Sequence, residues 1–178
     1  MFIMEHKSSL LTVLEVFASE PMRIHYIKEI SKKIDLAPTS VKLHINYLLQ
    51  NNLIIKKKGD IFEGYLSNRD NENFIFYKKI INLIRLKESG LVDFIKGLLH
   101  PEAIVLYGSY AKGEDVEQSD IDLLAITKAK KQLNLEKFEV ILKRKIHIIS
   151  EERLKKLSNE LKQELVNGIV LYGYLKYE

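Results

Sequence analysis

Two aspartates separated by one residue, Asp120 and Asp122, are the side chains of this chain best suited to chemistry. They lie in 119–126, an apolar run that predicts a strand, and strand alternation would point both carboxylates the same way. Two carboxylates this close repel each other, and one takes up a proton unless a cation lies between them. Oxygen ligands favour Mg²⁺ or Mn²⁺, so the pair predicts a divalent metal site.

Gly108 and Ser109 come directly after the apolar run 103–107, which predicts a buried strand. A glycine lets the backbone approach a phosphate, amides at a strand-to-helix turn donate to it, and Ser109 adds a hydroxyl. Together with a metal at the two aspartates, these groups favour a bound nucleoside triphosphate. In-line attack on its α-phosphate, with pyrophosphate leaving, is the chemistry that such a site supports.

The sequence Gly108-Ser109, ten residues, then Asp120-Ile121-Asp122 resembles the signature of the polymerase-β-like nucleotidyltransferase superfamily, in particular the minimal nucleotidyltransferases. The resemblance covers residues 98–175. It implies Asp120 and Asp122 as catalytic metal ligands and Gly108 and Ser109 as nucleotide-binding residues. The implied reaction transfers a nucleoside monophosphate from a triphosphate such as ATP to a hydroxyl of a small molecule or a partner protein.

The sequence departs from this family on a later strand, expected at 145–149. The family has a third carboxylate there, which binds a second metal, whereas this chain has His147. Histidine binds divalent metals, but Mg²⁺ prefers oxygen, so His147 is either a metal ligand or a strand histidine without a catalytic role. Glu139, Glu151 and Glu152 are the nearby substitutes, and none lies in the expected register.

Two interpretations of function follow. In the first, the protein is an active nucleotidyltransferase, and the family that it resembles includes antitoxins that modify a helical toxin encoded beside them. In the second, it is a DNA-binding transcriptional regulator whose nucleotidyltransferase domain senses nucleotide or has lost catalysis. The two are compatible, since antitoxins often repress their own operons.

The N-terminal residues predict three helices followed by a hairpin. Helical spacing of apolar residues predicts helices over 8–19, 25–34 and 38–51. Period-two runs at 53–58 and 61–67 predict two strands, joined by a turn at Gly59-Asp60.

This order of elements resembles the winged helix-turn-helix family over residues 5–68. The resemblance places the third helix in the DNA major groove and the hairpin on the phosphate backbone. A small helical domain that binds protein is the alternative. The DNA-binding residues would be Thr39, Ser40, Lys42, Asn46, Lys56, Lys57 and Lys58.

Between these parts, polar residues at 68–73 predict a boundary, and two further helices are expected at 72–88 and 91–99. The first carries an apolar face that must be buried, either on the second domain or in a homodimer. Its residues are Phe74, Tyr77, Ile80, Ile81 and Ile84. The predicted domains are therefore a winged helix at 1–68, a helical connector at 69–100 and a minimal nucleotidyltransferase domain at 101–178.

The predicted fold class is α+β, with a C-terminal mixed sheet. Helices at 133–143 and 151–166 are expected to cover one side of that sheet. The chain has 178 residues, no cysteine, 46% hydrophobic residues and a net charge of +4. This composition predicts a folded protein without disulfides, and the charge permits nucleic-acid binding without indicating it. No apolar run is long enough to span a membrane and no signal peptide is evident, so a cytoplasmic location is expected.

Overall fold

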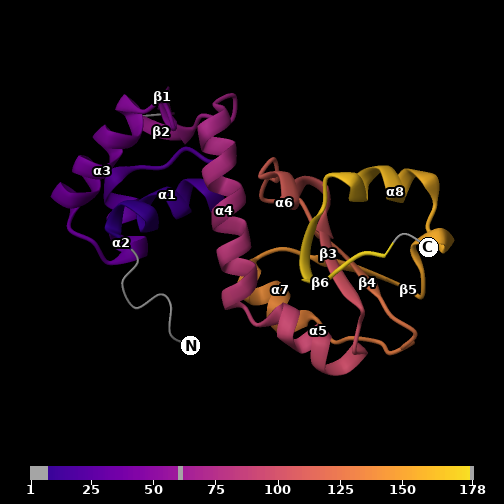
Figure 1. Cartoon of the computed structure of the whole chain (residues 1–178). Coiled ribbons are helices and arrows are strands. Elements are labelled where there is room, and N and C mark those ends of the chain that lie inside the picture. The colour runs from indigo at the N-terminus through magenta and orange to yellow at the C-terminus, as the bar shows by residue number, and fades with distance from the viewer. Residues whose placement is uncertain (1–7, 60–61, 177–178) are drawn as a thin grey trace. The chain divides into compact units, whose positions relative to one another are not determined.

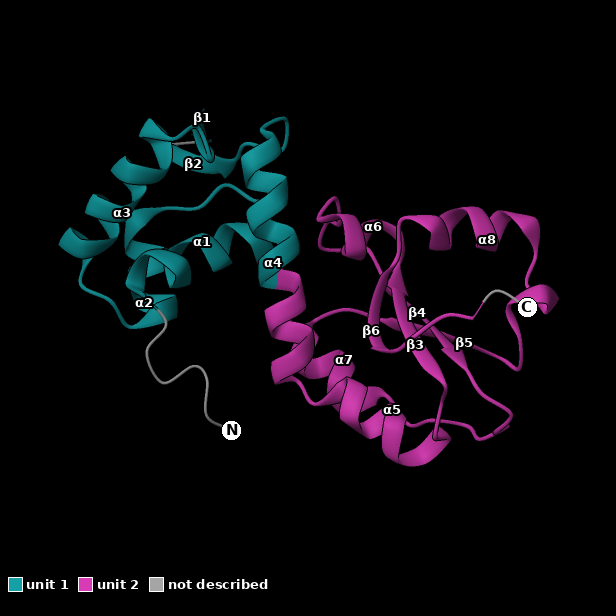
Figure 2. Cartoon of the chain, viewed as in Figure 1, with its two compact units in different colours: residues 1–81 teal, residues 82–178 magenta. Residues whose placement is uncertain are grey.

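The computed structural model of the chain describes residues 8–59 and 62–176. It divides into two compact units, residues 1–81 and 82–178, which are considered separately (Figure 2). Helices and strands are both present, and the sheet of the second unit is mixed, so the predicted α+β class is confirmed (Figure 1). In the described part of the chain, no helix is both long and apolar enough to cross a membrane.

The first unit begins with three helices: α1 (Ser9–Ser19), α2 (Ile27–Ile34) and α3 (Pro38–Gln50). The Ser8 hydroxyl accepts a hydrogen bond from the Leu11 amide and caps α1. Pro38 occupies the first turn of α3, where its missing N–H costs nothing. The three predicted helices are thereby confirmed within one or two residues at each end.

A two-stranded antiparallel hairpin follows, formed by β1 (Ile54–Lys58) and β2 (Glu63–Ser67). Lys56 lies opposite Tyr65, and Tyr65 also pairs with His25, which adds a short bridge on the other edge. Asp60 of the predicted turn and Ile61 of the second predicted strand lie outside the described residues. The hydrophobic core of the unit joins all three helices to β1 and to the start of α4 (Glu72–Glu88), through Phe17, Ile30, Ile45, Ile54 and Phe74.

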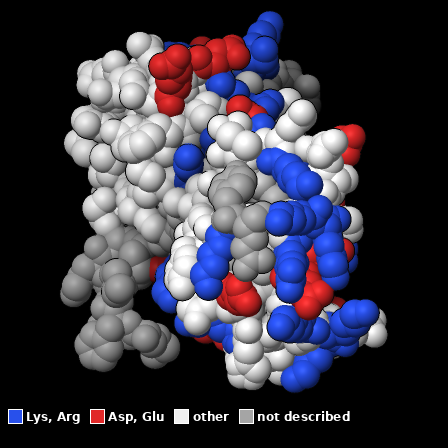
Figure 3. Space-filling view, turned by 45° about the vertical axis from the view of Figure 1, so that its right-hand side comes forward, with Lys and Arg blue, Asp and Glu red and all other residues white. Residues whose placement is uncertain are grey.

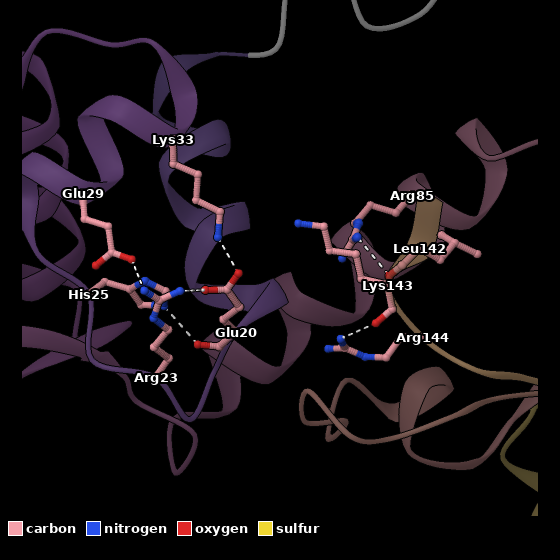
Figure 4. A network of polar contacts seen from close by, with 9 residues as sticks. All are labelled: Glu20, Arg23, His25, Glu29, Lys33, Arg85, Leu142, Lys143 and Arg144. Carbon is pink, nitrogen blue, oxygen red and sulfur yellow. Dashed lines mark hydrogen bonds and ion pairs between the residues drawn. The ribbon is translucent and has the colours of Figure 1, made fainter. Parts of the chain in front are cut away.

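Charged side chains hold the segment between α1 and α2 (Figure 4). The Glu20 carboxylate accepts from Arg23 at 3.0 Å and from Lys33, and Arg23 also pairs with Glu29. The Glu20 carbonyl lies 3.0 Å from His25 Nε2. The two cations and a nearby histidine lower the pKa of the Glu20 carboxyl although its partial burial opposes this.

The second unit is built on a four-stranded sheet in the order β5-β4-β3-β6. β3 (Ala103–Tyr107) is antiparallel to both β4 (Ile121–Ile126) and β6 (Ile169–Gly173), and β5 (Ile146–Glu151) is parallel to β4. The helices of this unit are α5 (Leu91–Leu99), α6 (Gly108–Lys112), α7 (Glu136–Leu142), the 3₁₀ helix η1 (Leu154–Lys156) and α8 (Asn159–Val166).

Helices cover both faces of this sheet, so the expectation of helices on one side is wrong. Ile104 and Leu106 of β3 pack with residues of α5, α6 and α7. Ala103, Val105 and Tyr107 point the other way and pack with Leu157 and with Leu165 of α8. Every residue of β3 is buried, which is the reason its sequence is a continuous apolar run rather than an alternating one.

Three predicted elements have different bounds. The helix expected at 151–166 is in fact the end of β5, η1 and α8, because the Ser158 hydroxyl accepts from the Leu161 amide and starts a new helix there. The strand expected at 119–126 begins at Ile121, so Asp120 precedes β4 instead of lying in it. The helix expected at 133–143 is shorter: α7 begins only at Glu136, and Lys143 ends it by adopting a left-handed conformation.

The two units meet inside α4, between Ile81 and Asn82. The helix predicted at 72–88 is confirmed, but its apolar side chains do not share one buried face. Phe74 and Ile81 are buried in the first unit, whereas Tyr77 and Ile80 are exposed. The boundary therefore lies further along the chain than the polar residues 68–73 suggested, because α4 supplies side chains to both cores.

Candidate active site

The end of β3 and the start of β4 bring Gly108 against Asp122. Tyr107, the last residue of β3, pairs with Asp122, and α6 begins at the next residue with Gly108 at φ +73°. A Cβ atom on Gly108 would lie 2.6 Å from the Asp122 Oδ2 atom, closer than real Cβ contacts allow. The backbone conformation favours glycine here, and any side chain at this position would displace the Asp122 carboxylate.

Asp122 is half-buried and surrounded by charge. Burial raises the pKa of the Asp122 carboxyl, and the negative charges of Asp120 and Glu164 raise it further, while His147 lowers it. Asp120 is exposed and acts on Asp122 through space, from the loop that enters β4. The two aspartates are thus neighbours, as expected, although strand alternation is not what places them.

His147 lies beside Asp122 on the next strand. The parallel register of β4 and β5 pairs the two residues, so both side chains project from the same face of the sheet. His147 is exposed, and its charge lowers the pKa of the Asp122 carboxyl. The position expected for a third carboxylate is therefore occupied by this histidine.

The three glutamates considered as substitutes have other partners or positions. Glu139 accepts from Lys145 Nζ at 2.9 Å and from the Ile146 amide at 3.1 Å. Glu151 pairs with Ile126 at the opposite end of β4, and Glu152 pairs with Lys156 at 2.8 Å. None of them replaces a carboxylate at the position of His147.

Glu164 of α8 is the acidic residue that sequence reasoning missed. Its charge contributes to the raised pKa of Asp122; burial, Asp122 and Glu164 together raise the pKa of Tyr107 to about 12. α8 lies on the face of the sheet from which Asp122 projects, with Leu165 in the same core as Leu124 and Ile126. Expecting helices on both faces of the sheet would have drawn attention to Glu164.

The acidic surroundings of Asp122 fit a cation. Among residues 8–59 and 62–176, no three His, Asp or Glu side chains converge as a ready-made ligand set, so Asp120, Asp122 and His147 do not form one by themselves. Mg²⁺ in nucleotide sites is held by one or two carboxylates together with substrate phosphates and water. Two repelling carboxylates match the protein part of that donor set.

A shallow groove of about 590 Å³ runs from Asp120 along α7. The turn that forms its wall is fixed by Arg85, which donates to the Leu142 carbonyl at 3.1 Å, and by Arg144, which donates to the Lys143 carbonyl at 3.0 Å (Figure 4). The groove is lined by Glu117, Gln118, Ser119, Asp120, Glu136, Glu139, Val140, Lys143, Arg144 and Lys145.

Comparison with known protein families decides what this unit is. Residues 90–176 match the family described as Polymerase beta, Nucleotidyltransferase, and all five predicted site residues of the second unit lie in that range. Residues 90–176 are a polymerase beta-type nucleotidyltransferase domain.

One solved structure similar to the chain comes from Sulfolobus solfataricus and is described, provisionally, as a nucleotidyltransferase. It shares 21% sequence identity, and the alignment covers 53% of this chain and 83% of that one, with a TM-score of 0.31. A likeness of that size assigns neither fold nor function. Among curated proteins, none matches this chain.

The nucleotidyltransferase domain begins before the connector was expected to end. Its matched range includes α5, and Leu91, Ile95 and Leu99 pack with Ile104 and Leu106 of β3. α5 is thus part of the core beneath the site. The prediction of a separate connector up to residue 100 treated α5 as a linking helix, because the sequence of α5 carries no chemical motif.

A buried polar network positions the loop that carries Asp120. Asp115, between α6 and β4, is 1% exposed and accepts from Asn82 Nδ2 at 2.7 Å and from Arg144 Nη2 at 3.4 Å. Asn82 also donates to the Tyr110 carbonyl at 3.1 Å. The network joins α4, α6, the loop before β4 and the segment that leads into β5. It therefore fixes the loop that carries Asp120 and the segment that precedes His147.

In the first unit, the predicted DNA-contacting residues of α3 differ in exposure. Thr39, Lys42 and Asn46 are exposed, whereas Ser40 is half-buried. Two large apolar side chains on α3 are also exposed: Leu43 at 66% and Tyr47, which sequence reasoning missed, at 50%. Tyr47 lies one helical turn after Leu43, and that spacing was the signal for it.

The three lysines of the hairpin are exposed but not equivalent. Lys56 pairs with Glu63 across the hairpin at 3.1 Å. Strand alternation places Lys56 and Lys58 on one side of β1 and Lys57 on the other. They therefore present positive charge on both sides of the hairpin instead of in one row.

Proposed function

We propose that this protein transfers a nucleoside monophosphate from a nucleoside triphosphate, ATP in the first instance, to a hydroxyl of a partner protein or small molecule. The close approach of the Gly108 turn to the Asp122 carboxylate carries the proposal, because backbone amides that would bind phosphate then lie beside a carboxylate that would bind a metal. The match of residues 90–176 to the nucleotidyltransferase family supports the same class of reaction.

The site residues have two proposed roles, phosphate binding and metal binding. Gly108 and Ser109 would bind the phosphates through backbone amides and the serine hydroxyl. Asp120 and Asp122 would hold Mg²⁺ or Mn²⁺, which supplies charge neutralisation for the pyrophosphate leaving group. The acceptor oxygen would bond to the α-phosphorus as the bond from that phosphorus to the leaving pyrophosphate oxygen breaks, and the acceptor proton would pass to solvent water.

The groove beside Asp120 is the proposed acceptor site. It ends at Asp120, one of the two proposed metal-binding carboxylates, and its wall carries Lys143 and the apolar Val140, which is 76% exposed. A surface of mixed charge and apolar side chains suits a protein segment or a substituted small molecule.

Transfer of label from α-³²P-labelled ATP tests the proposal. Protein, Mg²⁺ or Mn²⁺, and candidate acceptors should give labelled acceptor, and Asp120→Asn and Asp122→Asn should abolish it. Asp70→Asn, an exposed carboxylate of the first unit, is the matched control and should leave transfer unchanged. Binding of ATP without any label transfer would reject the enzyme in favour of a sensor.

The alternative function is a DNA-binding transcriptional regulator with a nucleotide-sensing or inactive domain. His147 in place of a third carboxylate is the observation that favours it. His147→Asp discriminates between the two: an enzyme slowed by the missing carboxylate should transfer label faster, by roughly tenfold or more, because one general base or metal ligand is restored. An inactive sensor should show no transfer in either form, while ATP alters its DNA affinity.

We also propose that the first unit is a winged helix-turn-helix domain that binds DNA. Three helices followed by an antiparallel hairpin support this, with Thr39, Lys42 and Asn46 exposed on the third helix. A DNA-binding regulatory part joined to a nucleotidyltransferase would suit an antitoxin-like protein that modifies a partner and represses its own operon.

Salt dependence tests the hairpin contacts. Lys57→Ala/Lys58→Ala should weaken DNA binding and reduce the slope of log K against log salt by about 0.9 for each lost phosphate contact. Lys130→Ala/Lys131→Ala, an adjacent pair in the second unit, should leave the slope unchanged. Equal slopes for both double variants would remove the hairpin from the DNA interface.

A homodimer is the proposed explanation for the exposed apolar residues of α4. Phe76 is 58% exposed and Tyr77 43%, and their rings contact each other edge to face. Sedimentation equilibrium should show a dimer that Phe76→Ser/Tyr77→Ser converts to monomer. A monomeric parent protein at all concentrations would exclude this surface as a dimer interface.

A further inference from the structure

A second cavity lies in the nucleotidyltransferase domain, at the opposite end of the sheet from Gly108. It has a volume of about 610 Å³ and is bounded by the end of β4, by η1 and α8, and by the residues that follow β6. Ile126 lines it, four residues along β4 from Asp122, a separation of about 13 Å along the strand. The cavity is therefore distinct from the carboxylate pair.

The floor of this cavity is apolar. Ile126 and Leu165 are 6% and 9% exposed and belong to the core between the sheet and α8. Leu154 and Leu175 pack on the same core from two other segments, and Val166 continues the wall into solvent. The floor would bury an aliphatic or aromatic group without desolvating a polar one.

The rim of the cavity is cationic. Five basic residues line it against two acidic ones, and the rim cations are Lys128, Arg153, Lys155, Lys162 and Lys176. Of the acids, Glu152 is paired with Lys156 at 2.8 Å and also interacts with Lys128 and Arg153, and the five cations still leave the rim with a net positive charge. Lys162 Nζ donates to the Lys155 carbonyl at 3.3 Å, which holds α8 and η1 together at the rim. Figure 3 shows Lys and Arg side chains gathered on this side of the molecule.

We infer that this cavity binds an amphiphilic organic anion, a small molecule with an apolar body and a phosphate or similar anionic group. The apolar floor would take the body and the rim cations the anionic group. The volume falls in the range of about 300–1,000 Å³ that is typical of small-molecule sites. A nucleic-acid backbone needs a charged track rather than an apolar floor, so a small molecule suits this cavity better.

An intrinsic fluorophore placed at the rim provides the measurement. The chain contains no tryptophan, and Tyr174, 67% exposed, lines the cavity, so Tyr174→Trp creates a single reporter there. Its emission is followed in the full chain during titration with octyl phosphate, with AMP, with 1-octanol and with inorganic phosphate. Octyl phosphate and AMP distinguish an aliphatic from an aromatic body.

Saturable binding of octyl phosphate or AMP is expected, at least about tenfold tighter than 1-octanol or inorganic phosphate, because only the first two combine an aliphatic chain or an aromatic ring with a charged phosphate. Inorganic phosphate binding as tightly as both amphiphiles would overturn the inference, and so would an unchanged emission throughout. An acidic apolar peptide binding more tightly than every small molecule would replace the proposed ligand by a protein.

Charge reversal at the rim provides the matched test. Lys128→Glu/Lys155→Glu, in the reporter background, should weaken octyl phosphate or AMP at least about tenfold by placing like charges together. Lys57→Glu/Lys58→Glu makes the same change in net charge in the first unit and should leave the affinity unaltered. Equal affinities in both double variants would contradict the inference.

This inference does not depend on the proposed transfer reaction, because the titration contains neither triphosphate nor metal. Asp122→Asn in the reporter background should bind the amphiphile as tightly as the parent. A tenfold loss in that variant would place the ligand at the carboxylate site instead of in the cavity.

Discussion

At the scale of single residues, the contact between Gly108 and Asp122 makes the sharpest prediction. Gly108→Ala places a methyl group against Asp122 Oδ2 on a backbone with φ +73°. We expect a stability loss of about 1–2 kcal/mol from the left-handed conformation. Nucleotidyl transfer should fall about 100-fold, since a displaced carboxylate misaligns the reacting groups. Urea denaturation and label transfer measure the two effects.

Gly97→Ala is the control for this substitution. Gly97 lies within α5, a Cβ atom added to it would have no neighbour within 4 Å, and its backbone is not left-handed. Alanine should therefore raise stability by about 1 kcal/mol through helix propensity and leave transfer unchanged. A similar loss of transfer in both variants would show that the contact with Asp122 is not the cause.

The ionised Asp122 carboxylate, which the proposed chemistry needs, should lower the stability of the folded protein. Its pKa is raised in the folded protein, so the folded state holds the proton more tightly than the unfolded chain, and ionisation of Asp122 favours unfolding. The penalty is absent below the unfolded pKa, grows as pH rises through the folded pKa, and is complete above it. Asp122→Asn should thus stabilise the metal-free protein at pH 7.

The pH dependence of this stabilisation tests whether the charge of Asp122 is its cause. Urea denaturation in EDTA should show the stabilisation by Asp122→Asn at pH 7 and its disappearance at about pH 3, where the carboxyl is protonated in both states. The same variant should lack transfer activity. A stability difference that is equal at both pH values would assign the effect to packing and not to charge.

At the scale of elements, the network around Asp115 should determine whether the site is assembled. Arg144→Met removes the guanidinium that pairs with the buried Asp115 carboxylate and should destabilise the domain by about 3–5 kcal/mol. Asp115→Leu/Arg144→Met should recover part of that loss, because the Asp115 carboxylate no longer stays buried without the Arg144 guanidinium. Thermal melting followed by circular dichroism measures both.

The neighbouring Lys145→Met is the control, since Lys145 is exposed and its pair with Glu139 is at the surface. Its melting temperature should change little. A double variant as unstable as Arg144→Met alone would mean that the network stabilises by shape and hydrogen bonding and not by charge compensation.

The elements were predictable where periodicity was strong. The helices over 8–19, 38–51 and 72–88 and the strands at 103–107 and 145–149 follow from apolar spacing, and the Gly108-Ser109 and Asp120/Asp122 motif predicts the candidate site. What spacing does not show is how a segment is interrupted or what covers it. Ser158 starts a new helix inside an apolar stripe that is continuous in the sequence. The sequence of a fully buried strand such as β3 does not show which helices cover its two faces.

Site residues outside the motif were hidden for a related reason. Glu164 reaches the site because α8 packs on the face from which Asp122 projects, a tertiary relation that no local spacing encodes. His147 was identified from the family resemblance, as the residue in the place of a third carboxylate, and the parallel pairing of β4 and β5 puts it next to Asp122. Its catalytic role stays a prediction, to be decided by His147→Asp.

At the scale of the whole molecule, α4 contributes to two cores, and this predicts where the chain can be cut. A fragment of residues 72–178 keeps Asn82 and the buried Leu86 of the second unit, whereas 90–178 loses both. Loss of Leu86 should cost about 2–5 kcal/mol. Loss of the Asn82 hydrogen bonds should add about 1–3 kcal/mol.

The shorter fragment should therefore melt more than about 10 °C below the longer one, given about 4–8 °C for each kcal/mol in a domain of this size. Circular dichroism melting of the two fragments, side by side, is the measurement. Equal melting temperatures would show that the matched family range is a complete folding unit and that α4 is dispensable to it.

The packing of Gly108 on Asp122 also has a consequence for how relatives of this domain diverge. Two constraints act on position 108, a left-handed backbone and a carboxylate in contact, and only the second depends on Asp122. Where a descendant has replaced Asp122 by a smaller residue, Asn or Asp becomes acceptable at position 108, because both tolerate the left-handed conformation. Lineages that abandon the chemistry should then lose the two residues in a fixed order, the aspartate first and the glycine afterwards.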